Sequence, residues 1–182
     1  IEQNARVIDI GTGAGFPGVP VKIARPDLDM TLMDASRKKL AFIERALTEI
    51  GERIPEGPCC KLVHARAEEA GRDTEHREAY DVAFARAVAE MKVLTELALL
   101  LVKVGGVLIA QKSEGSDTEI EAAKPLVGRL GGKIEKIARM KIPGTDITRL
   151  LVVVAKKKST PPEFPRPYSR ISKLKGQKPG RL

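Results

Sequence analysis

The sequence predicts an α/β fold built on a mostly parallel, seven-stranded sheet with an antiparallel C-terminal hairpin at its reversed edge. Short apolar runs of strand length alternate with helix-length segments along most of the 182 residues. The first run ends in a glycine-rich turn that opens a helix, as in parallel βαβ units. The last two runs are joined by only 143–148, a hairpin-length connection, so they must run antiparallel.

The boundaries of the expected elements are set by apolar runs and by helix start and stop signals. Strands are expected at 7–10, 29–34, 61–65, 80–85, 107–112, 133–142 and 149–156. The first helix begins near Pro17 and must end before Pro26, which cannot continue it. A second helix runs from its cap Ser36 to Gly51. Further helices are expected at 90–102 and at 118–130, the latter interrupted by a proline.

A glycine-rich turn, Gly11-Thr-Gly13-Ala-Gly15, follows the acid Asp9 at the end of the first strand. Glycines permit positive φ and leave backbone N–H groups open at a helix N-terminus, which suits a nucleotide-like ligand. A dinucleotide fingerprint would need its third glycine where Phe16 stands. The spacing instead resembles the first motif of S-adenosylmethionine (SAM)-dependent methyltransferases. A tight turn without a ligand is the alternative.

The carboxyl ends of the parallel strands should meet at one edge of the sheet and form the ligand site. Asp34 ends the second strand, where a carboxylate can accept both ribose hydroxyl groups; a helix-entry acid is the alternative. Ala67 and Glu68 follow the third strand and can meet an adenine edge, although Glu68 alone suits a solvated helix start. Arg86 ends the fourth strand and can hold a carboxylate or a guanine edge, or form a surface salt bridge. Lys112 ends the fifth strand and can meet RNA phosphate.

The net charge of +8 is confined to the C-terminal segment. Nine basic residues and one acid occur from Lys156 onward, whereas 1–155 is net neutral. Five prolines in the same segment argue against a helix or a core, so an extended basic arm, 157–182, should follow a domain of residues 1–156. A solubilising tail or a membrane-surface anchor is the alternative. The expected RNA-binding residues are Lys112, Lys156, Lys157, Lys158, Arg166, Arg170, Lys173 and Lys175.

Composition excludes several other classes of protein. No apolar run approaches the ~20 residues of a membrane span, and no secretory signal is visible. Cys59 and Cys60 are adjacent, which suits neither a disulfide nor a metal site, so we expect a cytoplasmic protein without metal. His64 and His76 belong to no ligand or nucleophile motif and are interpreted as structural.

Several segments together resemble one family. Residues 9–20, 25–26, 31–42, 66–69, 85–87 and 111–112, together with the ending 162–182, look like the guanine-N7 methyltransferases of bacterial small-subunit ribosomal RNA, the glucose-inhibited division protein B family. The resemblance implies the Rossmann-like class I SAM-dependent methyltransferase fold, with a helical region ahead of the glycine-rich turn that is absent here. The expected cofactor-binding residues are Gly11, Gly13, Phe16, Asp34, Ala35, Ser36, Ala67, Glu68 and Arg86.

The resemblance also implies a reaction. A methyl group would pass from SAM to N7 of one guanine of 16S rRNA, at position 527 near the decoding centre. Guanine N7 has a free lone pair and no proton to lose, so Arg86, the expected catalytic residue, would be an orienting clamp rather than a base. The chain also lacks the Asn/Asp-Pro-Pro-aromatic motif of amino-group methyltransferases and a cysteine at a strand end.

The expected partner is 16S rRNA, naked or in an assembling small subunit, and the enzyme is expected to be a monomer. Other functions remain open at this point. The rival enzyme is a SAM-dependent methyltransferase for another RNA, a protein or a small molecule. The rival from another class is a non-catalytic, SAM-responsive RNA-binding module.

Overall fold

A computed structural model describes residues 1–54 and 57–176 and contains one seven-stranded sheet. Its strands are β1 (Arg6–Ile10), β2 (Asp29–Asp34), β3 (Lys61–His64), β4 (Tyr80–Arg86), β5 (Val102–Ser113), β6 (Gly132–Lys141) and β7 (Thr148–Lys156). They are ordered β3-β2-β1-β4-β5-β7-β6, and β7 is antiparallel to both of its neighbours. The predicted fold class is confirmed. However, the reversed strand lies one position in from the edge, because β7 inserts between β5 and β6.

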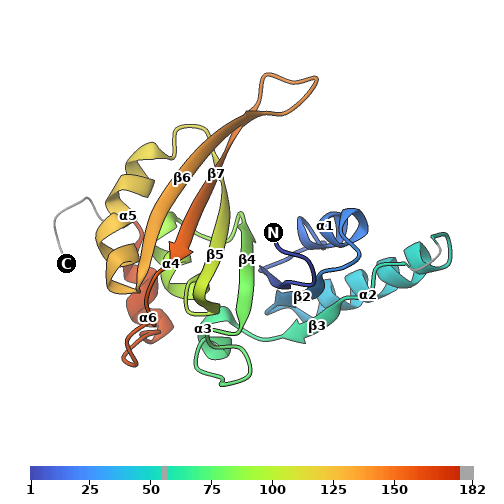
Figure 1. Ribbon diagram of the computed structural model, residues 1–182, viewed down its shortest axis with the longest axis horizontal. Helices are drawn as coiled ribbons and strands as arrows, with labels where there is room; N and C mark the ends of the chain where they lie inside the picture. The colour runs from blue at the N-terminus through green and yellow to red at the C-terminus, as the bar shows by residue number, and fades with distance from the viewer. Residues whose placement is uncertain (55–56, 177–182) are drawn as a thin grey trace.

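Helices cover both faces of the sheet (Figure 1). They are α1 (Gly18–Ala24), α2 (Arg37–Gly51), α3 (Ala67–Ala70), α4 (Met91–Ala98), α5 (Asp117–Arg129), α6 (Tyr168–Ile171) and the 3-10 helix η1 (Ser172–Leu174). Alternate residues of β1 point to opposite faces, so Val7 packs with Leu40 and Ile43 of α2, whereas Ile8 packs with the α4 and α5 side. The expected helix interruption at Pro125 does not occur, because α5 continues through it.

The carboxyl ends of β1, β2 and β4 lie together because these strands are parallel neighbours in register. Ile10 of β1 is paired with Met33 on one side and with Ala85 on the other. The residues that follow these strands therefore share one edge of the sheet, as expected. On the far side of β5, the β6–β7 hairpin extends well beyond the rest of the sheet (Figure 1).

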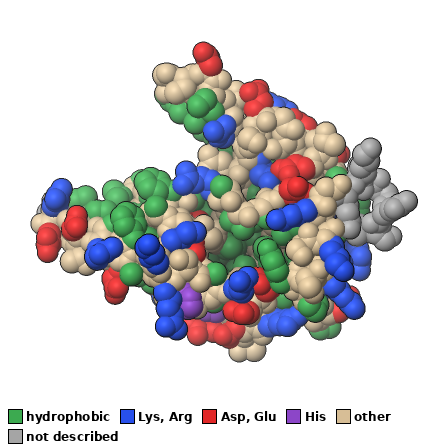
Figure 2. Space-filling model, turned by 180° about the vertical axis from the view of Figure 1, so that it is seen from behind, with side chains coloured by type: hydrophobic (Ala, Val, Ile, Leu, Met, Phe, Trp, Pro, Cys, Tyr) green, Lys and Arg blue, Asp and Glu red, His purple; other side chains and the backbone are tan. Residues whose placement is uncertain are grey.

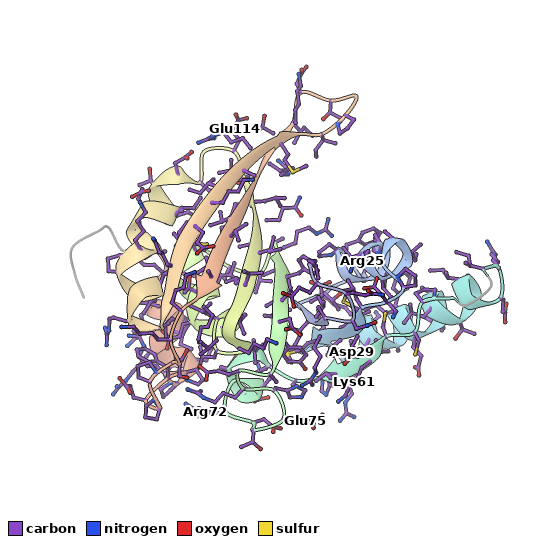
Figure 3. All side chains as sticks on the ribbon, in the orientation of Figure 1. Arg25, Asp29, Lys61, Arg72, Glu75 and Glu114 are labelled. Carbon is purple, nitrogen blue, oxygen red and sulfur yellow. The ribbon has the colours of Figure 1, made fainter. Side chains whose placement is uncertain are left out.

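The described part of the C-terminal segment, 157–176, is not an extended arm. Phe164, Ile171 and Leu174 are buried in the main core, and the segment forms α6 and η1. The expectation was wrong because prolines remove N–H donors but leave carbonyl groups, which arginines of the domain can bind. Arg72 donates to the carbonyl oxygen of Pro165 at 2.9 Å, and Figure 3 shows Arg72 beside this segment. Residues 177–182, also assigned to the arm, lie outside the described residues.

Within residues 1–54 and 57–176, no helix has the length and apolar character needed to cross a bilayer. In the same ranges, no group of three or more His, Cys, Asp or Glu side chains is arranged to hold a metal ion.

Candidate active site

Two neighbouring cavities lie at the carboxyl ends of the parallel strands. The smaller, of about 290 Å³, is lined among others by Gly11, Asp34, Ala35, Ala67 and Glu68, all expected site residues. The larger, of about 560 Å³, lies at the ends of β4 and β5 and at the start of β7. The loop 87–89 lines both cavities. In Figure 2, apolar side chains form the floor of a hollow between the β6–β7 hairpin and the α2 end, and both basic and acidic side chains lie around it.

The glycine-rich loop is organised around the carboxylate of Asp9. Asp9 is fully buried, and its Oδ2 accepts hydrogen bonds from Thr12 Oγ1 at 2.6 Å and from the Gly18 N–H at 2.9 Å. Gly11 and Gly13 have positive φ, +62° and +65°, which L side chains rarely adopt. Asp9 therefore closes the turn, and the glycines make that closure sterically possible.

Burial raises the pKa of Asp9 from 3.8 to about 6, against the hydrogen bonds from Thr12 and Gly18 and the charge of Arg86, which lower it. Asp9 Oδ1 is buried without a hydrogen-bond partner among the described residues. Asp9 is therefore an acid with a structural role whose pKa is also shifted by burial, a combination that occurs at functional sites.

Asp34 connects the loop, the end of β2 and the start of α2. Its side chain is only 7% exposed. Oδ2 accepts the Gly13 N–H at 3.0 Å, and Oδ1 accepts the Ser36 N–H at 2.9 Å. Lys39 Nζ lies 3.5 Å from Oδ2. The predicted cofactor-binding residues Gly13 and Ser36 do not line the smaller cavity. Their backbone N–H groups instead hold the side chain of Asp34, which does line it. The Ser36 side chain was expected to cap α2, but it makes no capping hydrogen bond. Only its backbone N–H forms a hydrogen bond here, to Asp34.

Glu68 is placed in the smaller cavity rather than on a solvated helix end. Its side chain is 14% exposed, and Arg66 Nη1 lies 3.7 Å from its Oε1. The neighbouring Glu69 instead completes the helix start, since its Oε2 accepts the Arg66 N–H at 3.3 Å. The solvated interpretation of Glu68 is therefore wrong.

Arg86 lies in the larger cavity at the end of β4. Its guanidinium carbon is 5.5 Å from the ring centroid of Phe16, which is 49% exposed and comes from the glycine-rich loop. The described residues provide no ion pair for Arg86, so the salt-bridge alternative is not supported. Ala87 follows with φ +56°, an uncommon conformation for a residue with a Cβ.

Lys112 holds the loop between the two cavities. Its Nζ donates to the carbonyl oxygen of Ala89 at 2.8 Å and lies 2.7 Å from Glu119 Oε1, and its side chain is only 11% exposed. The expected contact of Lys112 with RNA phosphate does not fit this environment, because an acid of α5 already neutralises the ammonium group.

Two more of the expected RNA-binding residues are engaged inside the protein. Lys156 is fully buried, donates to the carbonyl oxygen of Leu99 at 2.9 Å and lies 3.2 Å from Glu78 Oε1. Arg166 pairs with Glu96, which is fully buried. Neither side chain presents its charge to RNA. Sequence reasoning also missed Tyr168 and Lys175 as lining residues of the smaller cavity, because the proline-rich composition argued against any packing of this segment.

A family model described as rRNA small subunit methyltransferase G matches residues 1–148. The chain belongs to this family. Relatives named ribosomal RNA small subunit methyltransferase G include one from Acetivibrio thermocellus, 45% identical over 94% of this chain and 69% of its own length. Another, from Clostridium perfringens, is 42% identical over 92% of this chain and 68% of its own length. The family resemblance and the enzyme class predicted from the sequence are confirmed.

Solved structures support the fold of this rRNA small subunit methyltransferase G family member. A 16S rRNA (adenine(1408)-N(1))-methyltransferase with cosubstrate SAM from Catenulisporales acidiphilia aligns with a TM-score of 0.65 at 15% identity, covering 87% of this chain and 88% of that one. A putative methyltransferase from Thermoplasma acidophilum gives the same TM-score at 13% identity, covering 88% and 71%. The chain therefore has the fold of SAM-dependent methyltransferases.

Proposed function

We propose that the smaller cavity binds SAM and that the methyl group is transferred to N7 of a guanine of 16S rRNA. The observation that carries the proposal is the position of Asp34. A nearly buried carboxylate, held by N–H groups of the glycine-rich loop and of the α2 start, lines a cavity at the carboxyl ends of neighbouring parallel strands. This is the place where doubly wound folds bind nucleotide ligands.

The residues around the smaller cavity fit SAM. A Cβ on Gly11 would lie 3.0 Å from Val88 Cγ2, so a side chain at position 11 would crowd Val88 in the wall of the cavity that both residues line. Each carboxylate oxygen of Asp34 can still accept a bond from a ribose hydroxyl group. Ala35 and Ala67 add small side chains, with Glu68 beside them for the adenine amino group.

The larger cavity suits the target base. Its volume of about 560 Å³ lies in the range of small-ligand sites, and Arg86, Gln111 and Arg149 provide hydrogen-bond donors for the guanine edge. The loop 87–89 lines both cavities, so a base in the larger cavity would lie beside a cofactor in the smaller one. Arg86 would orient the base against the methyl group, so it acts as a clamp.

SAM supplies an electrophilic methyl group bound to a sulfonium sulfur. Guanine N7 attacks with a free lone pair, so the chain has to align the two partners but does not have to remove a proton. No thiol is placed for covalent catalysis, because Cys59 and Cys60 precede β3 and so lie at the opposite edge of the sheet. Burial also raises the pKa of Cys60 to about 11, which disfavours the thiolate.

The remaining basic residues of the C-terminal segment would contact rRNA phosphates. Lys157, Lys158, Arg170, Lys173 and Lys175 are exposed. Lys157 also lies 2.5 Å from Glu135, an exposed pair that an RNA phosphate can replace at little cost. The phosphate contact of Lys175 would lie next to the smaller cavity, which it lines.

A labelling experiment tests the proposal. The protein is incubated with methyl-labelled SAM and either deproteinised 16S rRNA or small ribosomal subunits, and N7-methylguanine is mapped by borohydride reduction and aniline cleavage. Asp34→Ala should weaken SAM binding at least tenfold in calorimetry. Asp29→Ala is the matched control at the other end of β2, where the side chain is 64% exposed, and should leave SAM binding unchanged.

Each rival function has its own outcome. Label in a protein or a small molecule, or in an RNA product that resists aniline cleavage, would contradict guanine N7 as the target. SAM and rRNA binding without any transfer would indicate the non-catalytic module. Equal SAM affinity in Asp34→Ala and the wild type would place the cofactor elsewhere.

A further inference from the structure

We propose that Tyr168 binds SAM at the adenine end of the smaller cavity, and that the Arg166–Glu96 ion pair positions it there. The C-terminal segment would then be part of the cofactor site as well as a source of positive charge. The inference rests on the proposed function, because it assumes that the smaller cavity is the SAM site.

Tyr168 is the first residue of α6 and lines the smaller cavity together with Asp34 and Ala67. The guanidinium carbon of Arg66 lies 5.9 Å from the centroid of its ring. Arg66 lines the same cavity directly before Ala67 and Glu68. The tyrosine ring therefore lies at the end of the cavity where these two residues favour adenine.

The ring is chemically suited to a purine. Tyr168 is 43% exposed, although aromatic side chains gain free energy when they are buried. An aromatic ring at the wall of a cavity is a surface on which a base can stack, and such stacking typically changes affinity by about tenfold or more. Arg66 on the ring adds a cation–π contact that helps to hold its orientation.

The ion pair two residues before Tyr168 anchors it to the domain. Glu96 of α4 is fully buried, so its charge needs a partner. Arg166 provides its backbone N–H at 2.9 Å and its Nε at 3.0 Å to Glu96 Oε1, and its Nη2 at 2.5 Å to Oε2. This many-point contact sets both the side chain and the backbone of Arg166, and thereby the start of α6.

Contacts on both sides of Tyr168 continue the anchoring. Arg77 donates to the carbonyl oxygens of Phe164 at 2.8 Å and of Thr160 at 3.1 Å. Beyond α6, Leu174 is buried and the Gly176 N–H reaches Glu90 Oε2 at 2.8 Å. Tyr168 is thus held in place before any ligand binds, which limits the entropy lost on binding.

Calorimetry of SAM binding to the full chain is the first test. Tyr168→Ala should raise the Kd for SAM about tenfold, whereas Tyr168→Phe, which keeps the ring, should change it less than threefold. Ser169→Ala, next to it on α6 but not lining the cavity, is the matched control and should bind SAM as the wild type does. Rates of methyl transfer are not needed for this comparison.

A fluorescence test reports the contact directly, since the chain contains no tryptophan. Tyr168→Trp introduces one indole at the cavity, and SAM should change its emission. Glu163→Trp places the same fluorophore at an exposed position of the segment and should not respond. Adding Arg166→Gln to Tyr168→Trp should weaken the SAM response about tenfold, and Arg166→Lys should restore part of it. Circular dichroism checks that each variant is folded.

The outcomes separate this inference from the proposed function. If Asp34→Ala loses SAM while Tyr168→Ala binds it normally, the cavity assignment stands and the role of Tyr168 is refuted. If the wild type itself does not bind SAM, the proposed function fails. If Tyr168→Ala weakens only rRNA binding, Tyr168 belongs to the RNA surface and the inference is overturned.

Discussion

The Gly18 N–H at the start of α1 donates a hydrogen bond of 2.9 Å to Asp9 Oδ2 at the end of β1, and so closes the glycine-rich loop. The two residues are nine positions apart, and the contact requires that position 18 have no side chain. A Cβ there would lie 3.0 Å from Asp9 Oδ2 and would overlap Leu32 Cδ2. The geometry of the loop and the protonation of its buried acid are therefore connected.

Gly18→Ala should lower the free energy of unfolding by about 1–3 kcal/mol, because Leu32 is fully buried and has little room to move. It should also weaken SAM binding, since the loop must shift. Gly128→Ala in α5 is the matched control, with no atom near the added Cβ, and should stabilise by about 0.5–1 kcal/mol. Urea unfolding measures both, and equal effects would contradict the close approach.

Asp9 should make stability depend on pH. Because burial raises its pKa to about 6, the folded state binds this proton more tightly than the unfolded state, whose pKa is 3.8. The free energy of unfolding should therefore decrease as the pH rises from about 4 to about 6, by on the order of 3 kcal/mol. Urea unfolding of the wild type and of Asp9→Asn across this range isolates the effect. Parallel curves for the two proteins would show that Asp9 does not titrate there.

Arg86→Ala should reduce methyl transfer on the order of 100-fold, because a misplaced base loses alignment with the methyl group. The melting temperature should stay close to that of the wild type, since Arg86 is exposed. Arg86→Lys should be intermediate, as a lysine cannot form the bidentate contact. Arg45→Ala, also exposed but on α2, should transfer normally. A loss of activity that only follows the loss of folded protein would make Arg86 structural.

Lys156→Met should destabilise the protein by about 1–3 kcal/mol, because it leaves the carbonyl group of Leu99 without its side-chain donor and the partly exposed Glu78 without its ion-pair partner. Its rRNA affinity, measured where the variant is folded, should match the wild type. Lys157→Met, at the adjacent exposed position, should change the free energy of unfolding by at most about 1 kcal/mol. It should instead weaken rRNA binding and make that binding less dependent on salt. Thermal unfolding and filter binding at several salt concentrations distinguish the two lysines.

The glycine-rich loop, Asp34 and the order of strands and helices were predictable from the sequence because their signals are local. Positive φ at Gly11 and Gly13 is a property of single residues, and the apolar period of α2 depends on neighbours three or four positions apart. The expected strand 29–34 coincides with β2, and Asp34 lies at its end. These signals also determined the fold class and supported the family resemblance.

The tertiary structure alone decided where β7 lies and what the C-terminal segment does. Inserting β7 between β5 and β6 depends on pairing between strands distant in the chain, such as the register of Lys112 opposite Leu150. Lys156 and Arg166 were predicted to bind RNA because their charges alone are visible in the sequence. Their ion-pair partners, Glu78 and Glu96, lie about seventy or more residues earlier in the chain. The sequence alone determined the glycine-rich loop, whereas long-range packing decided which basic residues are exposed, since burial and pairing of a charge depend on residues far away in sequence.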